Sequence, residues 1–269
     1  MRPMKALFAI ALLTSLSAIP SAQPPVPSPD SRQQAPPPVP TCPELATAMT
    51  TLMRNDARVR DWANLARYRE ANRSVPSPAE PARVVFMGDS ITDFWPQRVP
   101  EFFAGKPYVG RGISGQTTPQ MLVRFRRDVI DLKPRVVVIL AGTNDIAGNT
   151  GVMTDDDIQG NLASMAQLAK ANGIAVVLAS ITPVSAYHTS PTGVPQTSSR
   201  PMTRIRAINA WIKEYAAKNG HIYLDYFSAM VDDKGLLRED LSADDLHPNV
   251  AGYAVMGPLA QQAVAAALR

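Results

Sequence analysis

The sequence predicts an α/β fold with three layers, in which helices cover both faces of a parallel five-stranded sheet. Two patterns indicate this fold. From residue 83 onward, five short segments are almost entirely apolar, several of them rich in β-branched residues, and segments with helical patterning separate them. Strands that are apolar throughout are buried on both faces, and parallel neighbours are joined by crossovers that are usually helices.

Residues 1–22 precede this domain and are typical of a secretory signal peptide. Arg2 and Lys5 form a positive end, residues 6–19 are almost wholly apolar, and small residues ending at Ala22 offer a cleavage site. The apolar stretch is short for a membrane span, so we expect cleavage after Ala22 rather than an uncleaved anchor, and no stable membrane insertion afterwards. The protein is therefore expected to be exported, either to the periplasm or out of the cell.

A proline-rich linker is expected at residues 23–43, which hold nine prolines and cannot build helix or sheet ladders. A single domain is expected over residues 44–269, and it begins with a helix at about 44–72 that packs on its outside. Three residues at helical spacing indicate that helix: Trp62, Leu65 and Tyr68. Cys42 is the only cysteine, so an intramolecular disulfide is impossible.

Strands and helices then alternate along the domain. We expect strands at residues 83–87, 108–110, 136–141, 174–180 and 221–224. We expect helices at residues 118–132, 155–172, 202–219 and 249–268. In an open parallel sheet, ligands bind beyond the carboxyl ends of the strands, so the residues that follow the strands should meet at one edge.

Ser90 offers a hydroxyl nucleophile directly after the first strand, in the sequence GDSIT of residues 88–92. A serine needs a general base, and His247 is the best placed histidine. Asp244 lies three residues before it, where a carboxylate can accept a hydrogen bond from one ring nitrogen and leave the other free to take the serine proton. We therefore predict that Ser90, His247 and Asp244 are catalytic. For the other two histidines, His188 and His221, a role in a loop or in packing is a simpler interpretation than a catalytic one.

Ester hydrolysis also needs hydrogen-bond donors for the negative charge that develops on the carbonyl oxygen. The candidates are the backbone N–H of Ser90, the backbone N–H of Gly115 and the side-chain amide of Asn144, which follow the first three strands. Taken alone, Gly115 and Asn144 would be ordinary turn residues. Together with the nucleophile and base, they predict acyl transfer by a serine esterase.

These segments resemble the SGNH hydrolases, also called the GDSL-type lipase/esterase family. The resemblance covers residues 83–250 and rests on four blocks: GDS at 88–90, GISG at 112–115, GTND at 142–145 and DDLH at 244–247. Ile91 stands where the family name has leucine, and the family spacing favours Asp244 over its neighbour Asp245. The resemblance implies a flavodoxin-like fold and neither a metal nor another cofactor. For the site it implies a nucleophile, a base, an orienting carboxylate and two oxyanion donors: Ser90, His247, Asp244, Gly115 and Asn144.

Four residues near the same edge are candidate substrate contacts: Phe94, Trp95, Tyr187 and His188. Phe94 and Trp95 follow the nucleophile, and they either wall an acyl pocket or pack the start of a helix. Tyr187 and His188 lie in a loop at residues 185–201, which either shapes substrate choice or is a mobile insertion without a role.

Other classes of function fit the sequence less well. The sequence GRGISG at residues 110–115 matches the dinucleotide fingerprint, but its strand is short and no acid follows at the required distance. The chain lacks the Gly-x-Ser-x-Gly elbow and any Cys/His cluster for zinc. The formal net charge of +4 falls to +2 without Arg2 and Lys5, and no dense basic patch indicates a nucleic-acid partner.

The sequence thus predicts an exported serine esterase that acts on small-molecule or glycan esters. A short acyl group such as acetyl is preferred because no long apolar lid is apparent. The same residues would also serve a lysophospholipase, an arylesterase, a thioesterase or a sugar O-acetyltransferase. An alternative of a different class is a non-catalytic carbohydrate-binding protein on the same scaffold, but such a protein would lack a catalytic residue, and none is missing.

Overall fold

The computed structural model describes residues 41–76, 82–188 and 193–269. The signal peptide expected at residues 1–22 and nearly all of the linker expected at 23–43 lie outside these residues. None of the described helices has both the length and the apolar character that crossing a bilayer requires.

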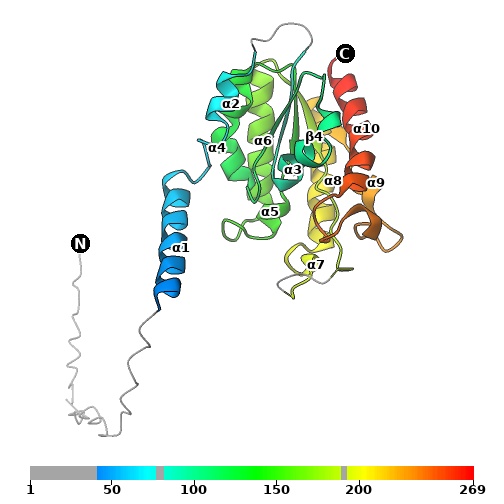
Figure 1. The fold of residues 1–269 in the computed structure, drawn as a ribbon. Helices are drawn as coiled ribbons and strands as arrows, with labels where there is room; N and C mark the ends of the chain where they lie inside the picture. The colour runs from blue at the N-terminus through cyan, green and yellow to red at the C-terminus, as the bar shows by residue number, and fades with distance from the viewer. Residues whose placement is uncertain (1–40, 77–81, 189–192) are drawn as a thin grey trace, which may run out of the picture. The chain divides into compact units, whose positions relative to one another are not determined.

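One sheet of five parallel strands, in the order β2-β1-β3-β4-β5, forms the centre of the fold (Figure 1). Its strands are β1 (Val84–Gly88), β2 (Tyr108–Gly112), β3 (Val136–Leu140), β4 (Ala175–Ala179) and β5 (Ile222–Leu224). Gly88 at the end of β1 pairs with Gly112 of β2 and with Leu140 of β3, so the carboxyl ends of these strands lie level with one another. The predicted parallel sheet is confirmed, and the residues that follow these strands share one edge.

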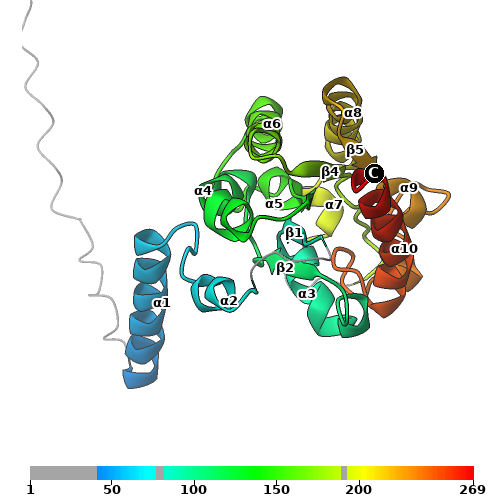
Figure 2. The ribbon, with the colours of Figure 1, turned by 90° about the horizontal axis from the view of Figure 1, so that it is seen from above.

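Helices cover both faces of the sheet and complete the three predicted layers (Figure 2). One face packs against α4 (Thr118–Asp128), α6 (Asp155–Ala171) and α8 (Met202–Asn219), and the other against α3 (Ser90–Arg98), α9 (Phe227–Met230) and α10 (Val250–Ala267). Val85 and Val137 face the first group, whereas their neighbours Phe86 and Val138 face the second. Because each strand is buried on both sides, its sequence is apolar throughout. The shorter described elements are η1 (Pro100–Phe102), η2 (Ile130–Leu132), α5 (Thr143–Ile146), α7 (Gln196–Ser199) and η3 (Glu239–Leu241).

The prediction of a single helix at residues 44–72 is wrong. Two helices occupy this region: α1 (Cys42–Arg60), which begins inside the expected linker, and α2 (Arg69–Arg73). Between them the chain turns, because the Asp61 carboxylate accepts hydrogen bonds from the backbone N–H groups of Leu65 (2.7 Å) and Ala66 (2.9 Å). An aspartate that binds nearby N–H groups in this way offers the backbone an alternative to the helix.

The sheet and every candidate site residue belong to one compact unit, Met49–Arg269. Within that unit, α2 lies beside α4 and β2 at the edge of the sheet (Figure 2). Asn72 of α2 fixes this contact by donating to the Asp128 carboxylate at 2.7 Å.

Two glycines let α3 lie directly on the ends of β1 and β2. A Cβ atom on Gly112 would lie 2.1 Å from the backbone nitrogen of Asp93 in α3. One on Gly88 would lie 2.1 Å from the Thr92 hydroxyl oxygen in α3 and 2.8 Å from the carbonyl oxygen of Leu140. No side chain fits at such distances, so the close approach of α3 requires glycine at both positions. This contact holds Ser90, the first residue of α3, at the edge of the sheet.

Candidate active site

Ser90 begins α3 immediately after the strand β1 ends. Asp89 caps the helix, since its carboxylate accepts a hydrogen bond from the backbone N–H of Ile91 at 3.0 Å. The N–H groups of the first helical turn have no partner inside a helix and favour negative charge near its start. The hydroxyl of Ser90 therefore lies where an alkoxide or an oxyanion would be stabilised.

His247 and Asp244 are joined to Ser90 by a continuous series of hydrogen bonds. The Nε2 atom of His247 lies 2.9 Å from the Oγ atom of Ser90, and its Nδ1 atom lies 2.6 Å from Oδ2 of Asp244. The other oxygen of Asp244 accepts bonds from the backbone N–H of His247 at 2.7 Å and from the hydroxyl of Ser242 at 3.1 Å. Partial burial opposes ionisation of Asp244, but the bonds from His247 hold its pKa well below the usual range. The carboxylate thus favours a proton on Nδ1 and leaves Nε2 free to accept one.

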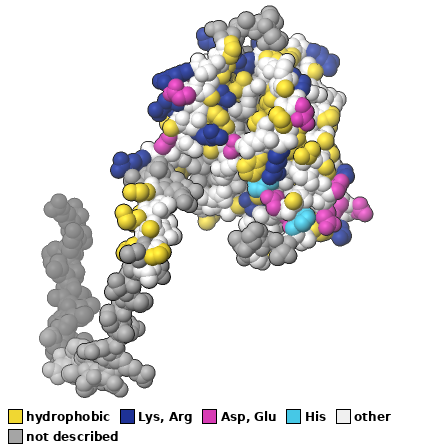
Figure 3. Space-filling model, viewed as in Figure 1, with side chains coloured by type: hydrophobic (Ala, Val, Ile, Leu, Met, Phe, Trp, Pro, Cys, Tyr) yellow, Lys and Arg dark blue, Asp and Glu magenta, His cyan; other side chains and the backbone are white. Residues whose placement is uncertain are grey.

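Asp245 is directed away from His247 and holds a loop instead. Its backbone adopts a positive φ of 67°. Its carboxylate accepts bonds from the Ser185 hydroxyl at 2.6 Å and from the His188 backbone N–H at 2.9 Å, and it lies 2.9 Å from the His188 ring nitrogen Nδ1. Figure 3 shows histidine and acidic side chains near one another at the lower right of the folded part. Of the two adjacent aspartates, the structure brings only Asp244 to His247.

Two of the candidate oxyanion donors, Asn144 and Gly115, are linked through Gln116. Asn144 lies at the start of α5, directly beyond β3, and is 4% exposed. Its Nδ2 atom donates to the carbonyl of Gln116 at 3.0 Å, which ties Asn144 to the residue after Gly115. Gly115 has a φ of +80° and an exposed backbone. One hydrogen of the Asn144 amide remains for a ligand, as does the N–H of Ser90 at the helix start.

Arg200 is a residue near the site that the sequence does not single out. It is 7% exposed, and its Nε donates to the Thr143 hydroxyl at 3.1 Å. Another of its nitrogens lies 3.5 Å from the side-chain oxygen of Asn144. Among the described residues, no carboxylate forms an ion pair with it. A fixed positive charge therefore lies behind the Asn144 amide, on the side of its oxygen. Its loop carries no recognisable motif, so only the three-dimensional structure connects it with Asn144.

The two aromatic candidates after the nucleophile have different environments. The ring centroid of Phe94 lies 5.1 Å from that of His247, so Phe94 flanks the base. Trp95 is 1% exposed and stacks on Phe102 and Tyr253 at centroid distances of 4.4 and 5.2 Å. Its interpretation as a substrate contact is corrected, since an indole enclosed in the core cannot reach a ligand.

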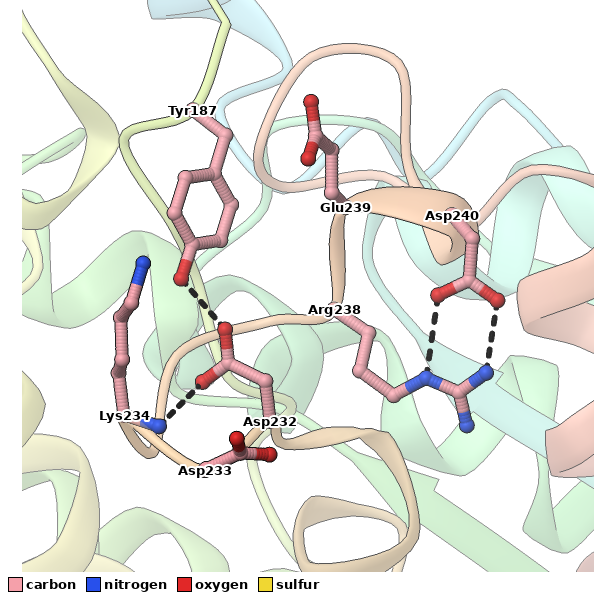
Figure 4. A pocket seen from close by; sticks show the side chains of 7 residues that line it. All are labelled: Tyr187, Asp232, Asp233, Lys234, Arg238, Glu239 and Asp240. Carbon is pink, nitrogen blue, oxygen red and sulfur yellow. Dashed lines mark hydrogen bonds and ion pairs between the residues drawn. The ribbon is translucent and has the colours of Figure 1, made fainter.

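Tyr187 contributes to a separate pocket of about 670 Å³ (Figure 4). Its hydroxyl donates to the Asp232 carboxylate, which raises the pKa of Tyr187 to about 12. Arg238 binds Asp240 in the same pocket through two bonds of 3.0 and 2.7 Å. The pocket lining includes neither Ser90 nor His247. Tyr187 and His188 are thus held by acidic side chains of the following loops.

The part of the chain that the structure describes holds no group of three or more His, Cys, Asp or Glu residues able to bind a metal.

Asp89 makes protein stability depend on pH in a specific direction. One of its carboxylate oxygens is buried without a hydrogen-bond partner, and burial raises its pKa to about 6. Because its pKa is lower in the unfolded state, the native state binds more protons between about pH 4 and pH 6, and the free energy of unfolding falls as pH rises through this range. Relative to Asp89→Asn, the free energy of unfolding of the wild type should fall by about 2 kcal/mol between pH 4 and pH 7. Urea unfolding of both proteins measures this difference, and parallel pH profiles would contradict it.

Comparisons with known proteins agree on one family. Residues 86–255 match the model of the GDSL-like lipase/acylhydrolase family. A candidate acylhydrolase from Bacteroides fragilis NCTC 9343 has 45% sequence identity and a TM-score of 0.72, over 77% of this chain and 99% of that one. A GDSL-like lipase from Bacteroides thetaiotaomicron VPI-5482 has 43% identity and a TM-score of 0.71, over the same shares of the two chains.

A more distant structure shares the fold. It is a catalytic mutant of an acetylxylan esterase from Geobacillus stearothermophilus, with 21% identity and a TM-score of 0.54 over 70% of this chain and 96% of that one. No curated protein gives a significant match. The family match covers β1 from Phe86 onward, the other four strands, and Ser90, Asp244 and His247. The chain therefore belongs to the GDSL-like lipase/acylhydrolase family and is a carboxylic ester hydrolase.

Proposed function

We propose that the protein is an exported serine esterase that removes short acyl groups, above all acetyl, from glycans or other small esters. One observation carries the catalytic part of this proposal. The hydroxyl of Ser90, the imidazole of His247 and the carboxylate of Asp244 form a hydrogen-bonded series with successive distances of 2.9 and 2.6 Å.

In the proposed reaction, the Oγ atom of Ser90 attacks the ester carbonyl carbon while Nε2 of His247 takes its proton. The N–H groups of Ser90 and Gly115 and the amide of Asn144 bind the negatively charged carbonyl oxygen. The carbon–oxygen bond to the alcohol then breaks, and His247 returns the proton to the departing alcohol. Water, activated by the same imidazole, attacks the acyl-serine, and the carboxylic acid and free Ser90 are released.

The polar surroundings of the site support a short acyl group. The residues that line the pocket beside Gly115 include four amide and two hydroxyl side chains, interspersed with apolar ones such as Trp62. A long acyl chain would gain about 0.8 kcal/mol per buried methylene in a continuous apolar groove, and a pocket of this mixed composition offers only part of that gain. An acetyl group needs no groove. Acetylated xylan is a suitable test substrate because a structure that shares the fold is an acetylxylan esterase.

Export rests on the sequence pattern of residues 1–22, whose positive end, apolar stretch and small-residue site are those of a cleaved signal peptide. An enzyme released by such cleavage would meet polymeric glycans outside the cytoplasm. This location agrees with a substrate that is too large to enter the cell.

Activity should fall as the acyl chain lengthens. We expect kcat/KM for p-nitrophenyl esters to be greatest at two to four carbons and to be lower by about tenfold or more at eight carbons and beyond, since no burial of methylenes compensates for their bulk. The measurement is a series from the acetate to the palmitate, with acetate release from acetylated xylan and pectin assayed in parallel. A preference for the longest chains would contradict the short-acyl proposal.

A further inference from the structure

A pocket of about 880 Å³ opens beside Gly115, and the N–H of Gly115 is the one group of its lining that takes part in the proposed chemistry. Three segments far apart in sequence form its walls. They are the turn after α1, the loop between β2 and α4 together with the first turn of α4, and the turn after α5. Among the residues they contribute are Trp62, Asn64, Gln120, Asn149 and Thr150. The N–H of Gly115 is a candidate oxyanion donor. An ester whose carbonyl oxygen binds there would therefore extend either its acyl part or its alcohol part into this pocket.

The indole of Trp62 presents an apolar surface in this pocket. Its residue is 45% exposed, in contrast to the buried Trp95. Three side chains from the neighbouring loop and from α4 fix the backbone around Trp62 by hydrogen bonds to its carbonyl groups. Gln120 donates to the carbonyl of Trp62 at 2.7 Å, and Gln116 donates to the next carbonyl, that of Ala63, at 2.7 Å. Arg127 donates to the carbonyl of Leu65 at 2.8 Å. An exposed aromatic ring on a fixed backbone is preorganised for stacking, because binding then costs little further conformational entropy.

Polar groups with unused hydrogen-bonding capacity surround this ring. Asn149 donates to the carbonyl of Gly115 at 3.1 Å, which leaves its side-chain oxygen and one hydrogen available. The side chain of Asn64 is exposed and forms no hydrogen bond with the residues that the structure describes. The hydroxyl of Thr150 lies 3.0 Å from that of Thr117 and retains capacity for a second bond. One aromatic surface with a few fixed polar groups is the composition of a small-molecule site.

The charge of the pocket restricts the class of ligand. Asp61 is the only charged residue among those that line it. Both of its carboxylate oxygens already accept backbone N–H groups, at 2.7 and 2.9 Å. With no lysine or arginine in the lining, the pocket has no partner for a phosphate or a carboxylate on the ligand. A neutral sugar ring fits better, since its C–H face is apolar and its edge carries hydroxyl groups that both donate and accept.

We propose that this pocket binds a neutral pyranose ring of the substrate's alcohol part, stacked on Trp62 and hydrogen-bonded by Asn64, Asn149 and Thr150. This inference rests on the proposed function, because it assigns the substrate class of the same site. It also gives a role to the turn at residues 61–68, which precedes the first strand and contributes to the site from outside the family match.

The test compares sugar esters with an ester that has no sugar. Acetate release from glucose pentaacetate, acetylated xylooligosaccharides and acetylated pectin is measured together with hydrolysis of p-nitrophenyl acetate. In Trp62→Ala, the ratio of kcat/KM for the sugar esters to that for p-nitrophenyl acetate should fall about tenfold or more. Trp62→Tyr, which keeps an aromatic face, should recover most of the ratio. Val152→Ala is the matched control, since Val152 is a fully exposed apolar residue close by that does not line the pocket.

A second arm separates this inference from the proposed catalysis. Deacetylated xylooligosaccharide is titrated into the Ser90→Ala protein by calorimetry, with and without Trp62→Ala, and the added substitution should weaken binding about tenfold. Two results would overturn the pocket assignment alone. One is an unchanged ratio for all the sugar esters in Trp62→Ala. The other is an enzyme that uses Ser90 on p-nitrophenyl acetate but cleaves none of the sugar esters. If Ser90→Ala leaves p-nitrophenyl acetate hydrolysis intact, the proposed catalysis fails. The titration then decides the pocket, and equal binding with and without Trp62 refutes it.

Discussion

Ser90→Ala is expected to lower kcat for p-nitrophenyl acetate by about four to six orders of magnitude. The substitution removes the oxygen that forms the acyl-enzyme, and no neighbouring group replaces it at 2.9 Å from the base. The remaining rate over that in water should come from binding and from the oxyanion donors alone. Steady-state kinetics with active-site titration of the wild-type enzyme measures the loss.

The fold should survive this substitution, because Ser90 loses only its hydroxyl and the glycines that position α3 are untouched. The thermal unfolding midpoint of Ser90→Ala should stay within a few degrees of wild type, since removal of one hydroxyl group is expected to cost about 1 kcal/mol of stability. Ser228→Ala provides the matched control, as Ser228 is an exposed serine on α9 that bonds only to nearby Asp225. Equal activity in Ser90→Ala and Ser228→Ala would refute the nucleophile.

Asp244→Asn is expected to lower kcat by about three to four orders of magnitude. The amide can no longer accept the Nδ1 proton of His247 as a charged partner, so the tautomer with Nε2 free to take the serine proton is lost. Burial works against the charge on Asp244, but the bonds from His247 outweigh it and hold its pKa low, so the wild-type carboxylate stays ionised throughout neutral pH.

The adjacent Asp245 allows a direct comparison. Asp245→Asn changes the same chemical group one residue away, at a carboxylate that holds the loop containing Ser185 and His188. We expect its effect on kcat to be smaller than that of Asp244→Asn by about a hundredfold or more, with its main cost in stability. The reverse order of effects would mean that the carboxylate beside His247 is not the one that orients it.

The parallel sheet and its helices could be predicted because local pattern and burial agree. Strands such as β3 are apolar at every position, and this requires layers on both faces. The helix expected at 44–72 failed for a local reason. The spacing of Trp62, Leu65 and Tyr68 suits a helix, but Asp61 binds the N–H groups that the helix would use. Periodicity cannot detect this competition between a side chain and the backbone.

The chemistry-bearing residues of the site could be selected from the sequence because each follows a strand or precedes the last helix. Their selection depended on residue type and order, and the structure places Ser90, His247 and Asp244 within hydrogen-bonding distance. Trp95 and Arg200 could not be assigned in this way. The burial of Trp95 depends on contacts with Phe102 and Tyr253, and the approach of Arg200 to Asn144 depends on how a long loop returns to the sheet.

The central claim is that an acyl group is transferred to Ser90. The most direct measurement is the reaction of the wild-type protein with diethyl p-nitrophenyl phosphate, followed by intact mass and peptide mapping. We predict one diethylphosphoryl group per molecule, located on Ser90, with loss of esterase activity in proportion to labelling and no labelling of Ser90→Ala. Labelling at another residue, or full activity after Ser90 is modified, would contradict this account.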